Sequence, residues 1–331
     1  MDVLDQILSS LRLNGGVITD ATFTGDYCVQ AEFTPEKCAP FFLMPDHLIG
    51  YHYVRTGKTM VEVDGLPPME VSDGEVVILP RNARHVLSSR PGLPPAQVED
   101  VTVVTADGLH RIELGTPGPE TQVWCGFLGT AHSSAHPLLE SLPPLLKIDL
   151  SDGQAQWLDS SMRFVAHERP NSEMVARLAE LFIGQAIREY IDGLPDGAEG
   201  WLAGLRDPFV AKALEIIHNR YAEELDVESL AREVGVSRSV LGERFAELIG
   251  EPPMRYCARW RMRVASVLLR EGRDSTANIA YSVGFNSEAA FNRAFKREFG
   301  EPPATWRRRV EALEVARMEE LGQPLGERAA G

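Results

Sequence analysis

The sequence contains no long hydrophobic run, and this shortage excludes one broad class of protein. No apolar stretch among the 331 residues approaches the ~20 residues that a membrane-spanning helix requires. The first residues, MDVLDQILSSLRLNGG, also lack the basic start and long apolar stretch of an export signal. We therefore expect a cytoplasmic protein, and the length is sufficient for two domains that each bury a core.

Paired cysteines are lacking as well. The four cysteines have no CxxC spacing, which is typical of reduced thiols in a large cytosolic protein and not of a disulfide framework. Most are expected to be packing residues, although a redox sensor that uses one of the first three stays open as an alternative, because thiol reactivity depends on exposure and pKa. The cysteines are Cys28, Cys38, Cys125 and Cys257.

Positive charge is scarce overall but unevenly distributed. The net charge of −15 argues at first against a nucleic-acid partner, because phosphate contacts need Lys and Arg. Residues 1–206 carry 14 Lys and Arg against 28 Asp and Glu, whereas residues 207–309 carry 17 against 15. The acidity therefore belongs to the front of the chain and to the tail. Charge alone does not decide whether the C-terminal region binds DNA.

Hydrophobic patterning divides the chain into a sheet-rich front and a helical back, which predicts a multidomain α+β protein. From about residue 21 to residue 150, short alternating stretches are separated by turn residues, as in an antiparallel sandwich or barrel. Val61 and Val63 alternate with Glu62 and Asp64 in one such stretch. The apolar run at residues 76–79 predicts a strand that is covered on both faces.

Residues 171–191 predict one amphipathic helix that begins after Pro170. Its apolar stripe either docks on its own barrel or pairs with its twin in a dimer. The segment DGLPDGAEG at residues 192–200 is dense in Gly, Pro and Asp, which is typical of an interdomain linker. The residues expected along the stripe are Met174, Leu178, Leu181, Phe182 and Gln185.

The C-terminal region contains an internal duplication. AREVGVSRSVLGERFAELIGEPP, from Ala231, aligns with AYSVGFNSEAAFNRAFKREFGEPP, from Ala280, with one extra residue in the second turn. Each copy predicts a short helix, a turn with Gly, and a second helix that is capped by Ser and ended by GEPP. This is the pattern of a helix-turn-helix unit. An i, i+4 pair in each copy is expected to bury the second helix: Leu241 and Phe245, then Phe291 and Phe295.

Two helix-turn-helix units joined by a long arginine-bearing helix at residues 254–270 favour a protein with two DNA-reading heads, where each head is one helix-turn-helix unit. A helix capped by Asp207 and Pro208 precedes them. The alternative is a solenoid of helical hairpins that binds protein, but a solenoid needs at least about three repeats to bury a continuous core. Only two copies occur in this sequence.

On these motifs, the C-terminal region resembles the DNA-binding domain of the AraC/XylS family of bacterial transcription regulators. The second unit carries the signature most fully, in NIAYSVGFNSEAAFNRAFKREFGEPPATWR. The resemblance implies two recognition helices that enter successive major grooves on one face of double-stranded DNA, about one helical turn apart. A direct-repeat-like or split target site is expected.

The outward positions of the two recognition helices are the predicted DNA contacts. Arg293 and Asn292 are the best candidates for base readout, because Arg pairs with guanine and Asn with adenine. Glu243 stands where the second unit has Arg293, so strong guanine readout is not expected from the first unit there. Serines and lysine more often contact phosphate. The positions are Ser237, Arg238, Ser239, Gly242, Glu243 and Arg244 in the first helix, and Ser287, Glu288, Asn292, Arg293 and Lys296 in the second.

The front of the chain carries a second resemblance. DGEVVILPRNARH, with Gly74, Pro80 and His85, resembles the second conserved motif of the cupin superfamily, with Asn82 in place of a usual Gly. YHYVRTGK, which follows His47, resembles the first motif, although its paired histidines and glutamate are not intact. The resemblance implies a small β-barrel with a pocket that opens at one mouth.

Together the two resemblances cover nearly the whole chain and predict four segments. These are a cupin-like effector-binding domain at 1–156, the amphipathic dimerisation helix and linker at 157–200, an all-α DNA-binding domain with two helix-turn-helix units at 201–309, and a charged tail at 310–331.

Six residues are expected to line the effector pocket. Imidazole and thiolate groups suit zinc, copper or iron, so a divalent metal in the pocket is one alternative. Because the first cupin motif is degraded, roles in lining or packing are favoured over metal binding. A metal-dependent cupin enzyme fused to a DNA-binding domain is a further alternative, but such an enzyme needs an intact metal triad. The residues are His47, Tyr51, His52, Tyr53, His85 and Cys125.

The sequence thus predicts a homodimeric transcription regulator that is not an enzyme. A small-molecule effector in the barrel is expected to change how the tandem units bind DNA, which requires different affinities of the effector for two arrangements of the protein. Dimerisation would double the reading heads and raise avidity for paired sites.

Overall fold

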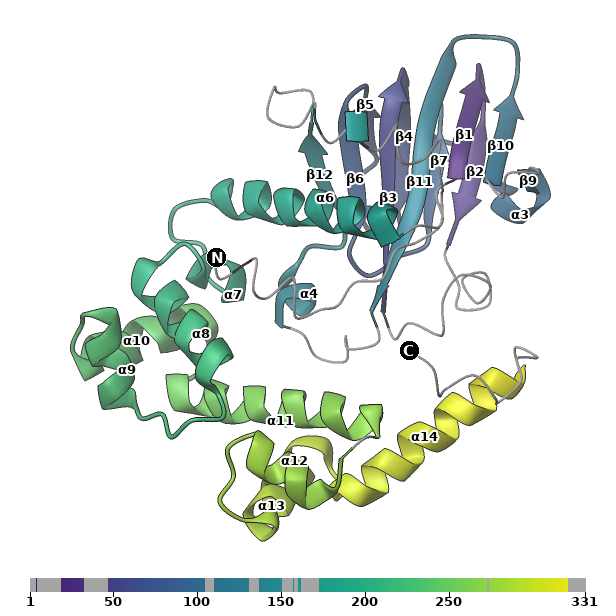
Figure 1. Ribbon diagram of the computed structural model, residues 1–331. Helices are drawn as coiled ribbons and strands as arrows, with labels where there is room; N and C mark the ends of the chain where they lie inside the picture. The colour runs from purple at the N-terminus through teal and green to yellow at the C-terminus, as the bar shows by residue number, and fades with distance from the viewer. Residues whose placement is uncertain are drawn as a thin grey trace. The chain divides into compact units, whose positions relative to one another are not determined.

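The computed structural model describes residues 19–32, 47–104, 110–130, 137–150, 173–272 and 274–320, together with Leu4, Trp157, Ser160 and Ser161. The chain divides into two compact units, one within residues 4–194 and the other from residue 195 onward. The first holds the strands and the second is helical (Figure 1). Cys38 and the tail after residue 320 lie outside the described residues, as does the predicted start of the amphipathic helix.

Two β-sheets build the front unit. The larger has seven strands in the order β12-β6-β3-β11-β1-β10-β9, and the smaller has five in the order β5-β4-β7-β2-β8. The pairs are antiparallel apart from β1–β10 and β2–β8. The strands are β1 (Thr19–Thr24), β2 (Cys28–Ala31), β3 (His47–Thr56), β4 (Lys58–Val63), β5 (Met69–Ser72), β6 (Glu75–Leu79), β7 (His85–Ser88), β8 (Ala96–Gln97), β9 (Thr102–Val104), β10 (His110–Gly115), β11 (Glu120–Thr130) and β12 (Leu146–Asp149).

One cluster of buried apolar side chains draws on both sheets, which therefore pack their inner faces together. Because side chains alternate along a strand, β4 buries Val61 and Val63 and leaves Glu62 at the surface of the sheet. All residues of β6 from Val76 to Leu79 are buried, which confirms the prediction of a strand covered on both faces. The short helices α3 (Val98–Val101) and α4 (Pro137–Ser141) lie between strands.

Asn82 shapes the turn between β6 and β7. Its φ is 48°, the left-handed region, and its N–H donates to the carbonyl of Leu79 at 3.0 Å. Asn adopts this conformation more readily than other residues with a side chain. This explains how Asn82 replaces the Gly that is usual in the cupin motif while the turn still delivers His85 to the start of β7.

Helix α6 (Glu173–Asp192) contacts β11 and β12 and lies along the larger sheet (Figure 1). The predicted helix is therefore present, but its buried stripe differs from the predicted one. Leu181 is 49% exposed and Gln185 is half-buried, while the side chains of Met174 and Phe182 are outside the described set. The buried stripe lies on a different side of the helix from the predicted one, because contact with the sheet decides which face is buried. It consists of Leu178, Ile183, Ala186, Ile187 and Ile191.

Eight helices of the described residues form the second unit. The predicted cap at its start is present, since the Asp207 carboxylate accepts from the N–H groups of Phe209 and Val210 at 2.9 Å. No helix of the described chain is long and apolar enough to cross a membrane. The helices are α7 (Trp201–Gly204), α8 (Pro208–Arg220), α9 (Val227–Val234), α10 (Arg238–Ile249), α11 (Pro253–Glu271), α12 (Thr276–Ser282), α13 (Glu288–Phe299) and α14 (Pro303–Glu320).

The duplication holds at the level of single interactions. The Ser237 and Ser287 hydroxyls each accept from the backbone N–H three residues later at 3.3 Å, so they cap α10 and α13 in the same way. Gly250 and Gly300 end these helices with φ of 82° and 80°. An aromatic ring that follows each GEPP segment meets a buried phenylalanine of the preceding helix edge-on. These pairs are Phe245 with Tyr256 and Phe295 with Trp306.

Candidate functional site

The two recognition helices expose one face each. Leu241 and Phe245 of α10, and Phe291 and Phe295 of α13, are fully buried and hold the helices against their units. The opposite faces are open, as predicted, and the candidate contacts lie on them. Exposed are Ser237, Arg238, Ser239, Glu243, Arg244, Ser287, Glu288, Arg293 and Lys296, whereas Gly242 and Asn292 are half-buried.

Two arginines of the first recognition helix are held by carboxylates of their own unit. Arg238 forms an ion pair with Glu228 of α9. Arg244 pairs with the second carboxylate oxygen of Asp207 at 2.9 Å, and its guanidinium lies 5.2 Å from the centre of the Phe209 ring. Because Asp207 also caps α8, Arg244 ties the recognition helix to the start of α8. The first head therefore presents little uncompensated positive charge.

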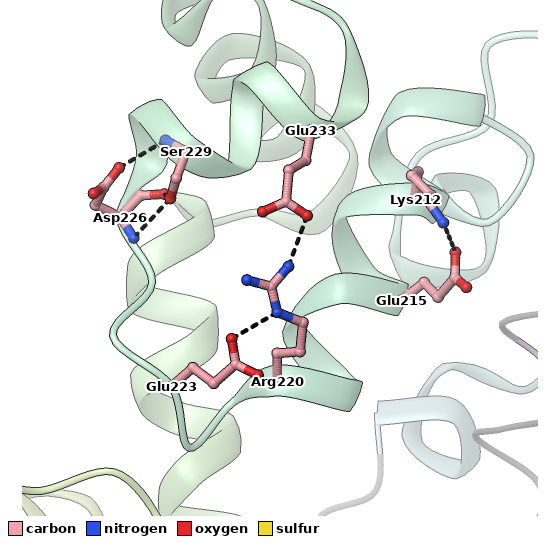
Figure 2. A network of polar contacts seen from close by, with 7 residues as sticks. All are labelled: Lys212, Glu215, Arg220, Glu223, Asp226, Ser229 and Glu233. Atoms are coloured by element: carbon pink, nitrogen blue, oxygen red, sulfur yellow. Dashed lines mark hydrogen bonds and ion pairs between the residues drawn. The ribbon is translucent and has the colours of Figure 1, made fainter.

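The neighbouring helices of the first unit continue this internal pairing (Figure 2). Arg220, at the end of α8, contacts Glu223 and Glu233 at 2.7 Å each. Lys212 pairs with Glu215 at 2.6 Å within α8. The cap of α9 is a reciprocal box in which the Asp226 carboxylate accepts from the Ser229 N–H at 2.7 Å. Two further cations of the first unit, Lys212 and Arg220, are thus paired with its own carboxylates.

The second recognition helix, in contrast, carries cations that are unpaired among the described residues. Arg293, Lys296 and Arg297 are exposed, and none forms an ion pair or a side-chain hydrogen bond within the described chain. Sequence reasoning omitted Arg297, although the run Lys296-Arg297 at the end of the helix was a visible signal. The Asn292 Oδ1 atom is buried without a hydrogen-bond partner. The bidentate adenine contact expected of Asn292 therefore requires its amide to turn outward.

In the front unit, His52 of β3 and His85 of β7 meet between the two sheets, with their Nε2 atoms 2.6 Å apart. The His85 Nδ1 atom lies 2.8 Å from the carbonyl oxygen of Ala83. A carbonyl only accepts, so the proton of a neutral His85 belongs on Nδ1 and its Nε2 accepts. His52 then donates from Nε2. The pair links the larger sheet to the smaller one.

Burial keeps both imidazoles neutral. It lowers the pKa of His85 to about 4, against the partly opposing hydrogen bond to Ala83. The pKa of His52 is also lowered well below its ordinary value, first by burial and then by the nearby His85. Two neutral imidazoles in an apolar interior offer hydrogen bonding without charge.

The six predicted pocket residues do not form one group. His52 pairs with Cys125 of β11 in the sheet register, and both belong to the inner face with His85. The alternation of β3 puts its three odd-numbered candidates on the other face of the larger sheet. Of these, His47 contacts the carbonyl of Pro80, and Tyr53 packs on Trp124. The buried Tyr51 ring lies over Gly126, and its hydroxyl has no hydrogen-bond partner in the described chain.

The described residues contain no group of three or more His, Cys, Asp or Glu side chains placed to hold a metal ion. Three cysteines are described and all are buried free thiols. Burial raises the pKa of Cys28, Cys125 and Cys257, which disfavours the reactive thiolate. Neither the metal alternative nor the thiol alternative gains support from these residues.

Two capped helix-turn-helix units on one rigid connecting helix define a DNA-binding domain with two heads, and here that domain follows a small sandwich of cupin type. Comparison with known proteins agrees. Residues 2–192 match the cupin family, and residues 230–309 match the family described as a helix-turn-helix domain.

Named relatives cover nearly the whole chain. An AraC-like transcription regulator of Streptomyces lividans is 31% identical over 93% of this chain and 98% of its own length. The transcriptional regulator AlkR of Acinetobacter baylyi is 28% identical over 93% of this chain and 99% of its own. Among solved structures, the DNA-binding domain of AdpA in complex with a target DNA is 30% identical over 32% of this chain and 96% of its own, with a TM-score of 0.31. The chain belongs to the AraC-like family of transcription regulators that carry an N-terminal cupin domain.

Proposed function

We propose that the second helix-turn-helix unit supplies most of the base readout of this regulator, while the first mainly positions the protein on DNA. The observation that supports this division is the difference in free cations. Arg293 and Lys296 are exposed, with no ion pair or side-chain hydrogen bond among the described residues, whereas Arg238 and Arg244 are paired with Glu228 and Asp207. A free guanidinium reaches both acceptors of guanine without first breaking an ion pair.

The test begins with selection of a target from random duplexes by the full chain. Arg293→Ala is expected to weaken specific binding by about 1–3 kcal/mol and to relax the preference at one base position. Arg238→Ala, the matched control in the first unit, should weaken binding to all sequences alike. An unchanged selected motif and affinity for Arg293→Ala would refute the proposal.

We further propose that a small, uncharged effector binds between the two sheets through the His52 and His85 imidazoles. The hydroxyls of Tyr27, Thr59 and Thr121 on this face donate to backbone carbonyls, so the two imidazoles are its main remaining source of specific hydrogen bonds. Neutral molecules screened for a rise in the unfolding temperature of the wild type should lose that effect on His52→Gln. A set of stabilising molecules that act equally on both proteins would contradict this site.

The homodimer also remains a proposal. Because the apolar stripe of α6 is used within the chain, a dimer through this helix would use its outer side, where Leu181 is exposed. Leu181→Glu should then shift a dimer to monomer in sedimentation experiments, and an unchanged dimer would exclude this side of α6. We also propose a cytoplasmic location, where the DNA target of such a regulator lies.

A further inference from the structure

Arg261 lies in the middle of α11, the helix that joins the two helix-turn-helix units. Its guanidinium donates to three backbone carbonyls: from Nε to Tyr221 at 2.6 Å, from Nη2 to Glu223 at 2.7 Å, and from Nη1 to Gly284 at 3.3 Å. Tyr221 and Glu223 lie between α8 and α9 of the first unit, whereas Gly284 is in the turn of the second. The planar fork of one arginine therefore joins both units.

Gly284 provides a second and independent sign that the two units are in direct contact. A Cβ atom on Gly284 would lie 2.6 Å from the carbonyl oxygen of Ala222 and 3.0 Å from its carbonyl carbon. Only a residue without a side chain allows the second turn to approach the 221–223 segment so closely. The equivalent Gly235 of the first unit has nearly the same φ, 85° against 81°, but its Cβ would meet nothing within 4 Å. The close approach is thus a property of the junction and not of the repeat.

Helix α11 packs against the second head along one face, since its Met262, Ala265 and Leu269 share a buried cluster with residues of α12 and α13. It ends at Gly272, which has a φ of 69°, and three residues separate that glycine from the first residue of α12. A small rocking of the second head on this one face would still move α13 relative to α10. Contacts from α11 and from the 221–223 segment to the turn at Gly284 close the arrangement at a second point.

We propose that Arg261 and Gly284 form an inter-unit clamp that sets the separation and angle of the two recognition helices, and hence the spacing of half-sites that this regulator accepts. Arg261 is in this view a positioning residue that acts through backbone carbonyls and not through DNA. The proposal rests on the proposed function, in which both heads contact DNA at half-sites, the second with most of the base readout and the first with the smaller part. Once one head is bound, the other has a high effective concentration at its half-site only if the geometry of the two heads matches the site. A rigid junction therefore favours target sites with one spacing of half-sites.

The experiment uses the full chain and the duplex selected by the wild type. Three duplexes are compared by fluorescence anisotropy: the selected one, one with a single base pair inserted between the half-sites, and one with the half-site of the first head scrambled. The variants are Arg261→Lys, which keeps the charge but loses the fork, and Gly284→Ala. Gly235→Ala is the matched control, because it introduces the same φ strain in open space.

We expect the insertion to weaken wild-type binding by about tenfold or more. For Arg261→Lys and Gly284→Ala the same insertion should cost less than about threefold, with weaker binding to the selected duplex and unchanged binding to the scrambled one. Gly235→Ala should keep the wild-type spacing preference. If one of the two clamp variants fails to fold, the other still decides.

Two results would overturn the clamp. One is a clamp variant that binds less tightly but keeps the full tenfold preference, since this would show a role in charge or stability alone. The other is a wild type that tolerates the insertion. Failure of the proposed division of base readout is distinguishable, because it would appear as an Arg293→Ala protein with an unchanged motif, whatever the spacing preference.

Discussion

The two helix-turn-helix units share a backbone plan and differ in what fills it. In the first unit the core contains a polar chain: the Trp201 indole N–H donates to the Tyr256 hydroxyl at 3.0 Å, and that hydroxyl lies 2.8 Å from His218 Nε2. The His218 ring is stacked on Trp260 with centroids 4.0 Å apart. The second unit instead packs aromatic side chains together, namely Phe285, Phe291, Phe295, Phe299 and Trp306.

The two units therefore share the features that shape the backbone, while the side chains of their cores differ. The serine caps, the terminal glycines and an ion pair between the glutamate of GEPP and an arginine eight residues later occur in both units. The pairs are Glu251 with Arg259 and Glu301 with Arg309. A hydrogen-bonded core is demanding, because loss of one member leaves the others buried and unpaired. The first unit is therefore the more sensitive of the two to single polar changes.

Among changes that distinguish the two units, the largest effect is expected from Tyr256→Phe. The change removes one hydroxyl with little change of volume, but it leaves the Trp201 indole and His218 without their shared partner. We expect a loss of about 2–4 kcal/mol in the free energy of unfolding, measured with urea. Tyr281→Phe, at an exposed tyrosine of the second unit, is the control and should change little. Equal effects of the two changes would show that the polar chain contributes nothing.

The second-largest difference between the units is expected on acidification, which should destabilise the first unit more than the second. The packing that excludes water from His218, and to a smaller degree the charge of Arg263, lower its pKa to about 3. Since the unfolded chain binds the proton at a pKa of about 6.5, the stability from neutral His218 is complete above that pH and is lost as the pH falls from 6.5 toward 3. The slope should be at most about 1.4 kcal/mol per pH unit.

Regional hydrogen exchange in the full chain, corrected for intrinsic rates, measures this separation. Helices α8 and α11 should lose protection between pH 6.5 and pH 4, whereas α12 and α13, whose unit contains no histidine, should not follow to the same extent. Equal losses of protection in both units would show that protonation of His218 does not act on the first unit alone.

Gly242 tests whether the first head approaches DNA closely. It lies within α10 with open space where a Cβ would be, so the protein itself does not need a glycine there. Gly242→Ala should raise the free energy of unfolding by about 0.5–1 kcal/mol, because glycine is unfavourable inside a helix. If the bare backbone faces the groove, affinity for the selected duplex should fall at the same time. Glu247→Ala on the same helix is the control, and a Gly242→Ala protein that binds as tightly as the wild type would remove this role.

The smallest expected effect concerns the paired arginines. Glu228→Gln releases Arg238, so binding at low salt should strengthen a few-fold and the dependence on salt should steepen by about one ion. Glu224→Gln removes an equal charge from an exposed position without releasing an arginine. The two variants should therefore differ. Identical salt slopes would mean that the ion pair does not withhold Arg238 from phosphate.

Much of the fold follows from local signals. The caps at Asp207, Ser237 and Ser287, the buried pairs on each recognition helix and the doubly covered strand β6 all depend on residues close in the chain, and all are present in the structure. The exposed positions of α10 and α13 follow from the same helical period. Local patterns fail where a distant surface decides, as at Leu181, which the sequence assigned to a buried stripe and the sheet leaves exposed.

The architecture with two heads can be predicted from the sequence, because periodicity, helix caps and an internal repeat depend on residues that are close along the chain. The difference between Glu243 and Arg293 is likewise visible in the aligned repeats. Which charges are paired and which histidines meet depends on the tertiary structure. Arg238 finds Glu228, Arg244 finds Asp207, His52 finds His85 and Arg261 finds three carbonyls, each across ten or more positions of the chain. Such partners are chosen by packing in three dimensions, which no spacing along the chain specifies.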